Sequence, residues 1–299
     1  MTDKRIGFIG VGLMGHGMAK NLVDKGWPLT VMAHRNRAPV EDLLARGAKE
    51  AKSPKEVAEA SDIVFLCITA SPQIEAVIRG PNGLIEGAHA GLIVVDCSTA
   101  DPNSTLSLAA DLEQHGVAMA DAPLGGTPTQ AEAGELSAMV GASDETYAAI
   151  EPAIGAWAAK AVHLGPVGTG HKMKLLNNFL AMGYAALYSE ALTTAAKVGI
   201  GPDVFDSVIR GSRMDCGFYQ TYMQYVLQRD RDAHKFTLSN AHKDMKYMAA
   251  MANDAGIANH LGAAIKNAYA TAEALGHGED YVPMLSDIVA RLNGTEPVD

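Results

Sequence analysis

The sequence predicts an α/β domain with a parallel sheet, followed by an all-α domain. Two observations predict this fold class. Over the first 165 residues, short runs of β-branched and apolar residues alternate with helical patterns, which is typical of a parallel sheet covered by helices. After a glycine-rich stretch at residues 165–170, no convincing strand pattern appears, and the helix-favouring residues alanine, leucine and methionine become frequent.

The alternating region begins with a strand, and helices separate most of the strands that follow. The expected strands lie near residues 5–9, 28–32, 62–67, 92–96, 117–120, 136–140 and 161–164. The expected helices lie near residues 13–25, 38–46, 54–60, 71–79, 103–115 and 144–155. Ser53 and Asp101 each precede a proline, so their side chains are expected to cap helices whose first position is the proline.

The second part of the chain is expected to be helical throughout. One long helix is predicted over about 171–197, where there is no proline and one internal glycine. Further helices are expected near 203–211, 217–228, 239–255, 258–273 and 281–292. We therefore predict one domain at residues 1–165 and a second at 166–299, joined by the glycine-rich stretch and the long helix.

Composition limits the classes of function. Of 299 residues, 48% are hydrophobic and 19% charged, as in ordinary globular proteins, and the net charge of -10 disfavours nucleic acid or an anionic membrane as a partner. Cys67, Cys97 and Cys216 lie far apart and form no CxxC pattern, which indicates a reducing compartment rather than disulfides or zinc. We expect a cytoplasmic location, because no targeting segment and no membrane-length apolar run is recognisable.

A glycine-rich turn follows the first expected strand and opens the first expected helix. In this context Gly10 permits a tight turn, Gly12 lets the backbone approach a pyrophosphate, and Gly15 lets the helix pack on the sheet. The pattern predicts a Rossmann-like dinucleotide site with the phosphates at the helix N-terminus. The alternative is an ordinary turn between a strand and a helix. The expected cofactor-binding residues of the turn are Gly10, Gly12, Leu13, Met14 and Gly15.

The segment after the second expected strand favours NADP over NAD. An NAD-binding fold places an acidic residue near this point to contact the ribose hydroxyls. Here the sequence has His34, Arg35 and Arg37 and no acid. Guanidinium groups bind phosphates with paired, charge-assisted hydrogen bonds, which suits the additional phosphate of NADP. The alternatives are a solvated basic loop and NAD as the cofactor.

Four motifs lie in order along the chain, at residues 10–15, at 121–127 followed by 134–136, at 168–178, and at 242–244. The run at 168–178, in which a lysine and two asparagines follow two glycines on an expected helix, is much more specific than the glycine turn. Together the motifs resemble those of the β-hydroxyacid dehydrogenase family, which includes 3-hydroxyisobutyrate dehydrogenases and semialdehyde reductases.

The resemblance implies a reaction and its principal residues. Family members have a Rossmann-like domain, a helical domain and an active site between them, and they transfer a hydride between NADP(H) or NAD(H) and a small β-hydroxyacid or its semialdehyde. Lys174 is implied as the general acid/base, with Asn178 on the same helix face. A homodimer or homotetramer and a small anionic substrate are implied as well. Without the family, Lys174 would be read as an exposed helix lysine.

The resemblance also assigns residues to the substrate and to the cofactor. A substrate-anion loop falls on Gly125, Gly126 and Thr127, where the serine of the usual Ser-Gly-Gly pattern is missing. Backbone N–H groups and the Thr127 hydroxyl remain as donors. The arginine of the sulfolactaldehyde reductase pattern is replaced by Gly126. Ser98 and Thr99 are implied near the nicotinamide ribose, with Ser98 assigned to the substrate and Thr99 to the cofactor. Ile68 and Lys243 are implied near the cofactor as well.

Two other functions remain as alternatives. A related imine reductase usually lacks the catalytic lysine, so Lys174 argues against it. A non-catalytic sensor that binds the dinucleotide would have no need of Lys174 and Asn178. A metal-dependent reaction is not expected, because the histidines are scattered and show no HExxH spacing.

Overall fold

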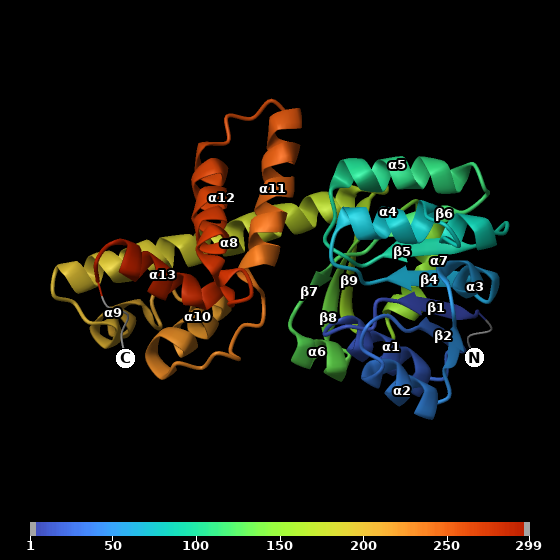
Figure 1. Cartoon of the computed structure of the whole chain (residues 1–299), viewed down its shortest axis with the longest axis horizontal. Coiled ribbons are helices and arrows are strands. Elements are labelled where there is room, and N and C mark those ends of the chain that lie inside the picture. The colour runs from blue at the N-terminus through green and yellow to red at the C-terminus, as the bar shows by residue number, and fades with distance from the viewer. Residues whose placement is uncertain (1–3, 296–299) are drawn as a thin grey trace. The chain divides into compact units, whose positions relative to one another are not determined.

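The computed structural model describes residues 4–295 (Figure 1). The chain divides into two compact units, Met1–Lys174 and Leu175–Asp299, called unit 1 and unit 2 below. The division falls inside the long helix α8, Thr169–Lys197. The sequence analysis ends the first domain before this helix, at residue 165, and how functions are shared between the two predicted domains stays a prediction.

Unit 1 is built on a mixed sheet, most of whose strand pairs are parallel. The order is β3-β2-β1-β4-β5-β6-β8-β7, with β9 paired to β8. Its first six strands follow the order common to dinucleotide-binding folds. The two antiparallel pairs of this sheet are β6 with β8 and β7 with β8. The strands are Ile6–Ile9 (β1), Leu29–Met32 (β2), Lys49–Ala51 (β3), Ile63–Leu66 (β4), Ile93–Asp96 (β5), Ala118–Asp121 (β6), Leu124–Gly125 (β7), Leu136–Gly141 (β8) and Ala158–Gly165 (β9).

Alternating side chains divide the interior of unit 1 into two apolar layers. Helices lie on both faces of the sheet (Figure 1). Phe65 of β4 lies in the layer with helices α1, α2 and α7, whereas its neighbours Val64 and Leu66 lie in the layer with α3, α4 and α5. A central parallel strand must be apolar on both faces for this reason. These helices are Gly15–Asp24 (α1), Ala38–Ala45 (α2), Pro54–Glu59 (α3), Ser71–Arg79 (α4), Pro102–Glu113 (α5) and Asp144–Ile154 (α7).

The predicted fold class is confirmed, and short elements account for most of the differences. The prediction lacks β3, β7, the helix α6 (Pro128–Ala133) and a 3-10 turn at Leu84–Gly87. These elements have two to six residues, too few to show a period. The predicted caps are present, since Ser53 accepts a hydrogen bond from the Glu56 N–H and Asp101 accepts one from the Asn103 N–H.

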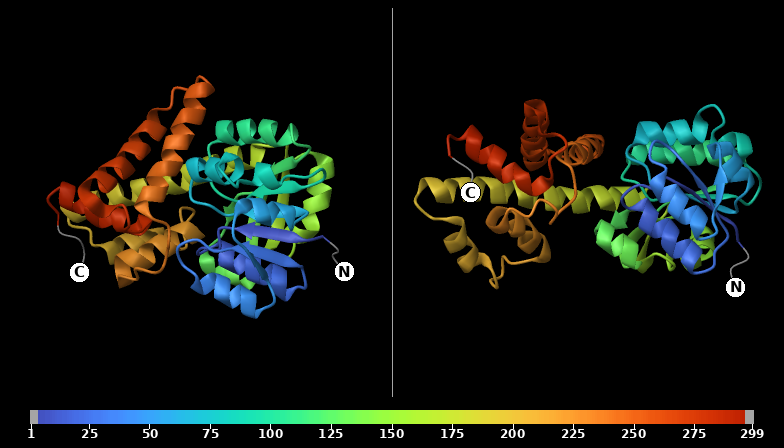
Figure 2. Two further views of the ribbon diagram at one scale, coloured as in Figure 1. Left: turned by 45° about the vertical axis from the view of Figure 1, so that its right-hand side comes forward. Right: turned by 60° about the horizontal axis from the view of Figure 1, so that its bottom comes forward.

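Unit 2 is helical, as predicted, and has its own apolar core. Tyr219, Tyr222 and Tyr269 are among its fully buried side chains. Helices α11 and α12 pack side by side (Figures 1 and 2). In the described part of the chain, no helix is long and apolar enough to cross a membrane. The helices after α8 are Pro202–Ile209 (α9), Gly217–Gln228 (α10), Leu238–Asp254 (α11), His260–Ala272 (α12) with a π-turn at Glu273–His277, a 3-10 turn at Val282–Met284, and Leu285–Leu292 (α13).

Candidate active site

The glycine turn between β1 and α1 lies at the carboxyl end of the central strands. A Cβ on Gly10, whose φ is +101°, would collide with the Cys67 carbonyl, and a Cβ on Gly15 would collide with the Gly10 carbonyl. A Cβ on Gly12 would meet nothing within 4 Å. The turn therefore needs glycine at 10 and 15 for its own geometry, and it leaves open space over Gly12.

The start of α1 offers hydrogen-bond donors beside this space. Met14 precedes the helix and its side chain makes no capping hydrogen bond, and Leu13 is 68% exposed. The first N–H groups of a helix have no partners within the helix, and the positive end of the helix dipole attracts anions. The turn also lies where the strand order reverses, the usual position of ligands in such sheets. These residues fit a pyrophosphate.

The three predicted basic residues at the end of β2 are all exposed, but they differ in their partners. Arg37 makes two hydrogen bonds to the Glu50 carboxylate of β3, at 3.0 and 3.1 Å, and these bonds lower the pKa of Glu50. Within residues 4–295, neither His34 nor Arg35 makes a side-chain ion pair. Arg35 is therefore better placed than Arg37 to meet an additional phosphate.

Predicted cofactor and substrate residues at the ends of β4 and β5 contact each other. The Ile68 N–H donates to the Ser98 hydroxyl at 2.9 Å, and the Ser98 N–H donates to Asp96 Oδ1 at 3.0 Å. Thr99, the next residue, is half-buried. Since β1, β4 and β5 are parallel neighbours, these residues share one sheet edge with the glycine turn.

Two thiols near this edge are unsuited to nucleophilic chemistry. Burial, with a smaller contribution from Asp96, raises the pKa of Cys67 to about 12. Burial also raises the pKa of Cys97 well above its ordinary value. Since the thiolate is the reactive form, both side chains are protonated and inert at neutral pH.

The predicted substrate loop follows β6 and includes β7. Gly126 has φ +124°, and a Cβ there would lie 2.8 Å from the Leu136 side chain. This backbone requires glycine. The Thr127 N–H and hydroxyl both donate to Gln130 Oε1, at 2.9 and 3.2 Å, and form a capping box at the start of α6. The hydroxyl that the sequence analysis assigns to the substrate is thus a helix cap here, and its role toward substrate stays a prediction.

Lys174 lies in the second turn of α8 and reaches this loop. Its ammonium Nζ donates to the Leu124 carbonyl at 2.7 Å, although fifty residues separate the two in sequence. The side chain is half-buried, and the Leu124 carbonyl directly precedes Gly125 and Gly126. The structure therefore brings the predicted acid/base and the predicted anion loop together within unit 1.

Asn178 and Lys243 are connected to each other within unit 2. The Asn178 side-chain amide donates to Asp244 Oδ2 at 2.6 Å, and Lys243 Nζ lies 3.2 Å from Asp244 Oδ1. Asn178 is 6% exposed and Asp244 is fully buried. The carboxylate of Asp244 thus orients two residues that the sequence analysis assigns to substrate and cofactor.

Three buried polar residues beneath the site were missed by the sequence analysis. Asp96 ends β5, Asp121 ends β6, and His171 lies in the first turn of α8, and all three are fully buried. An ionisable residue is rarely buried unless it is paired. Aspartates at the carboxyl ends of two apolar strands were the signal that could have identified them.

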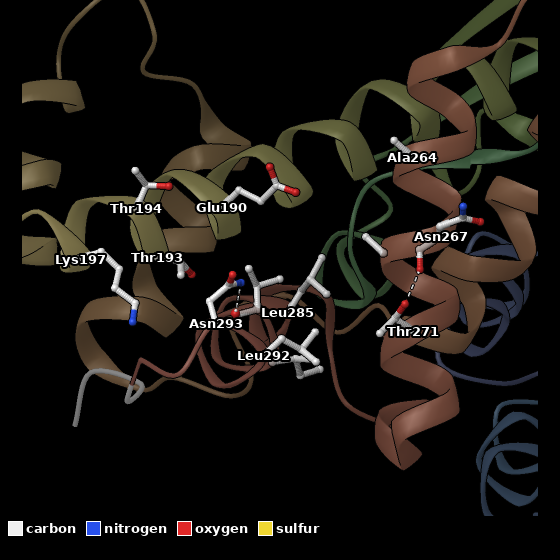
Figure 3. Close-up of a pocket in the computed structure, with 13 residues that line it drawn as sticks. Glu190, Thr193, Thr194, Lys197, Ala264, Asn267, Thr271, Leu285, Leu292 and Asn293 are labelled. Carbon is white, nitrogen blue, oxygen red and sulfur yellow. Dashed lines mark hydrogen bonds between the residues drawn. The ribbon is translucent and has the colours of Figure 1, made fainter.

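A cavity of about 630 Å³ lies elsewhere, among α8, α12 and α13 of unit 2 (Figure 3). Glu190, Lys197 and Asn267 contribute polar atoms to its wall, and Leu285 and Leu292 contribute apolar ones. None of the predicted site residues lines it. Among residues 4–295, no three His, Cys, Asp or Glu side chains gather into a group able to hold a metal ion.

Comparison with known proteins decides the family. The model of the "NAD binding domain of 6-phosphogluconate dehydrogenase" matches residues 5–165, and that of "NAD-binding of NADP-dependent 3-hydroxyisobutyrate dehydrogenase" matches residues 168–287. A 2-(hydroxymethyl)glutarate dehydrogenase of Eubacterium barkeri is 34% identical over 81% of this chain and 80% of its own. The chain belongs to the β-hydroxyacid dehydrogenase family.

Other comparisons agree with this family and separate it from the alternative. A 3-sulfolactaldehyde reductase of Escherichia coli is 31% identical over 95% of both chains. The crystal structure of a 3-hydroxyisobutyrate dehydrogenase from Salmonella typhimurium has a TM-score of 0.85 and 25% identity, covering 96% of this chain and 100% of its own. An imine reductase from Myxococcus stipitatus has a TM-score of 0.63 and 19% identity over 95% of this chain and 99% of its own, which shows similarity of fold alone.

Proposed function

We propose that this member of the β-hydroxyacid dehydrogenase family interconverts a small β-hydroxyacid and its semialdehyde with NADP(H), using Lys174 as the general acid/base. The observation that carries the proposal is the 2.7 Å hydrogen bond from Lys174 Nζ to the Leu124 carbonyl. It places an amine beside the loop of Gly125 and Gly126, whose backbone N–H groups are suited to a substrate acid group. A positioned proton donor and an anion site are the two elements that this reaction requires of the protein.

The nicotinamide dinucleotide is bound through the carboxyl edge of the sheet in this proposal. The N-terminus of α1 and the open space over Gly12 hold the pyrophosphate, and Ile68, Ser98 and Thr99 line the nicotinamide side. When bound, the dinucleotide supplies the hydride acceptor or donor. Lys243 of unit 2 is assigned to the cofactor as well.

Proton transfer is the step that the protein's own residues perform. In oxidation, the neutral Lys174 amine takes the proton of the substrate hydroxyl as the carbonyl forms. In reduction, the Lys174 ammonium returns a proton to the nascent alkoxide. The Leu124 carbonyl fixes the direction of the amine, and Asn178, four residues further along α8, is assigned to the same substrate on the same helix face.

The substrate class follows from the loop and from the relatives. The relatives are named for a (hydroxymethyl)glutarate and a sulfolactaldehyde, and both names combine an alcohol or aldehyde with an acid group. Since Gly126 carries no side chain, the acid group must be bound mainly by backbone N–H groups. Consecutive backbone N–H groups can bind such an anion without a charged side chain, and the acid group that we propose is a carboxylate.

The preference for NADP rests on the basic residues after β2. Arg35 is exposed and outside the pair of Arg37 with Glu50, so its guanidinium is available for the additional phosphate of NADP. NAD remains the alternative cofactor, because the phosphate-binding turn serves both dinucleotides.

We also propose a homodimer or homotetramer in the cytoplasm, with no nucleic acid or membrane as partner. Leu180, Tyr184 and Leu187 recur along one face of α8 and are 55%, 43% and 62% exposed, which favours a second copy of the chain as their cover. Cys67, Cys97 and Cys216 are all free, which suits a reducing compartment. Light scattering coupled to size exclusion measures the assembly, and a monomer at micromolar concentration would contradict it.

The decisive experiment follows nicotinamide absorbance with NADPH and NADH in turn. The aldehydes to be tested are glyoxylate, sulfolactaldehyde and the succinic, methylmalonic and tartronic semialdehydes, with 2-(hydroxymethyl)glutarate in the oxidative direction. Turnover of at least one, faster with NADPH, is the expected result. Dinucleotide binding without any turnover would instead support a non-catalytic sensor, and turnover restricted to cyclic imines would support an imine reductase.

A further inference from the structure

A buried polar cluster lies directly beneath the start of α8, within unit 1. Asp96, Asp121 and His171 are fully buried, and Thr105 is 1% exposed. Each comes from a different element, namely β5, β6, α8 and α5. None of these side chains reaches solvent, so none can contact a substrate, and the function proposed above leaves them without a role.

Asp121 fixes the first turn of α8. Its carboxylate accepts hydrogen bonds from the Gly168 N–H and the His171 N–H, both at 2.6 Å. A Cβ on Gly170 would collide with the Met139 carbonyl, so the helix start is seated against β8 with no space to shift. Burial raises the pKa of Asp121, and the charge of His171 and these two N–H groups oppose that shift. Burial of the Asp121 carboxylate is unfavourable, and the two N–H groups at the start of α8 compensate for part of that cost.

His171 connects the same turn to α5 and β5. Its Nδ1 lies 2.8 Å from the Thr105 hydroxyl, which donates its single proton to the Asp101 carbonyl at 3.1 Å. Nδ1 must therefore carry the proton of its hydrogen bond with Thr105. On the other side of the ring, Nε2 faces Asp96 Oδ2 at 3.8 Å, and neither atom has a hydrogen-bond partner within residues 4–295.

The cluster continues into the predicted nicotinamide side of the site. Asp96 accepts a hydrogen bond from the Ser98 N–H, and the Ser98 hydroxyl accepts one from the Ile68 N–H. At the other end, Lys174 lies three residues after His171, one helical turn along α8. A chain of contacts therefore runs from the loops after β4 and β5 to the helix that carries the lysine, and its link between Asp96 and His171 is the 3.8 Å approach of two side chains.

We infer that Asp121 and His171 are positioning residues for Lys174, which set the height and rotation of the first turn of α8 relative to Ile68 and Ser98. Hydrogen bonds are directional, so they fix a helix more sharply than apolar packing does. Apolar packing in place of buried ionisable side chains is often as stable or more stable, so stability alone does not explain why this cluster is present. The inference rests on the proposed function, because it is the acid/base role of Lys174 that makes its exact height matter.

The test compares His171→Asn and Asp121→Asn with a matched control. An asparagine at 171 can still donate to Thr105 but cannot reach Asp96, and an asparagine at 121 presents a donor to one of the two helix N–H groups. The control is His163→Asn, which likewise replaces a hydrogen-bonded imidazole. This ring is partly buried, is hydrogen-bonded to the Ala142 carbonyl at 2.9 Å, and stacks on the Tyr147 ring with 4.5 Å between the ring centroids.

Both test variants are expected to lose kcat by about 10- to 100-fold, the effect of an ångström-scale displacement, while the dinucleotide Kd changes by less than about threefold. Amide hydrogen exchange of residues 168–174 should accelerate about tenfold or more, and the acylation rate of Lys174 should change. The control should leave kcat, hydrogen exchange and the acylation rate unchanged, although its melting temperature should fall about as far as that of the test variants.

Normal kcat and normal exchange in His171→Asn would overturn the inference, as would an equal loss of kcat in His163→Asn, which would show a general effect of stability. If Asp121→Asn does not fold, His171→Asn decides alone. If the wild-type protein turns over no substrate, the proposed function has failed. Hydrogen exchange of residues 168–174 and acylation of Lys174 then still decide whether His171 positions the lysine.

Discussion

At the scale of single residues, chemistry depends on which partner a side chain already has. Lys174 is directed at the Leu124 carbonyl, whereas Lys172, two residues earlier on α8, is exposed and points elsewhere on the helix. Arg37 is paired with Glu50, but Arg35 makes no ion pair within residues 4–295. Lys172 is therefore a control for substitution of Lys174, and Arg37 is a control for substitution of Arg35.

Lys174→Ala is expected to reduce kcat by about 10²- to 10⁴-fold, the usual contribution of general acid–base catalysis. The dinucleotide Kd should stay within about threefold, since the proposed phosphate contacts come from the glycine turn. Steady-state kinetics and dinucleotide titration measure the two effects. Lys172→Ala is the matched control and should be active. A near-normal rate in Lys174→Ala would remove the proposed role.

Arg35→Ser is expected to weaken NADPH binding about 10- to 100-fold, the worth of a hydrogen bond to a charged group, and to leave NADH binding nearly unchanged. Arg37→Ser should have a smaller effect on NADPH, because its guanidinium is already paired with Glu50. Fluorescence titration with both dinucleotides measures the four affinities. Equal losses for NADH and NADPH in Arg35→Ser would show that the loop is only solvated surface.

At the scale of elements, a short helix connects the cofactor turn to the substrate loop. Helix α6 follows the substrate loop and packs closely on α1, where a Cβ on Gly17 would collide with the backbone of Ala131. Glu132 of α6 accepts a hydrogen bond from Lys20 at 2.6 Å and bonds His16 at 2.7 Å, and both partners lie on α1. This contact holds the two predicted ligand loops together within unit 1.

The α1–α6 contact is expected to weaken in acid. Burial alone would raise the pKa of Glu132, but the hydrogen bonds from Lys20 and His16 outweigh it and lower that pKa below its ordinary value. A carboxylate with a lowered pKa stabilises the folded state at higher pH, and this contribution is lost as pH falls through the folded-state pKa.

Glu132→Gln should therefore lower the melting temperature at neutral pH. Between about pH 5 and pH 3, the melting temperature of the variant should fall less steeply than that of wild type. Calorimetry over this range measures the difference from wild type. Glu135→Gln, an exposed neighbour with no ion pair in the described residues, is the control and should follow the wild-type curve. Parallel curves for wild type and Glu132→Gln would contradict the assignment.

At the scale of the whole molecule, the two units have separate apolar cores, and a spectroscopic signal can follow the unfolding of one of them. Both tryptophans of the chain, Trp27 and Trp157, are buried in unit 1. Tryptophan emission therefore follows the unfolding of the unit that carries the glycine turn. A ligand that binds only the folded state stabilises it in proportion to the logarithm of its concentration.

NADPH at about 100 times its Kd should stabilise the emission-detected transition by about 2.7 kcal/mol. Urea denaturation with and without NADPH measures this shift. Gly12→Val is the control, because its side chain would meet no protein atom near its Cβ but would fill the space proposed for the pyrophosphate. Without NADPH, this variant should unfold at the same urea concentration as wild type, and addition of NADPH should not shift its transition. A wild-type transition unmoved by NADPH would place the dinucleotide elsewhere.

The sequence by itself determined the parts whose signals are local. The alternation of strands and helices, the long helix α8, the caps at Ser53 and Asp101 and the glycine turn all depend on neighbours within a few residues. Short elements such as β3 and α6 were not predicted, because they are too short to show a hydrophobic period and are stabilised by the strands and helices around them.

Only the tertiary structure decided which side chains meet. The contact of Lys174 with Leu124, the pairing of Arg37 with Glu50 and the burial of His171 between two aspartates join residues that are distant in sequence. Such contacts depend on sheet order and register, and several potential partners compete for each polar group. A sequence pattern names the groups able to bind or react, whereas the packed fold selects the partner that each one has.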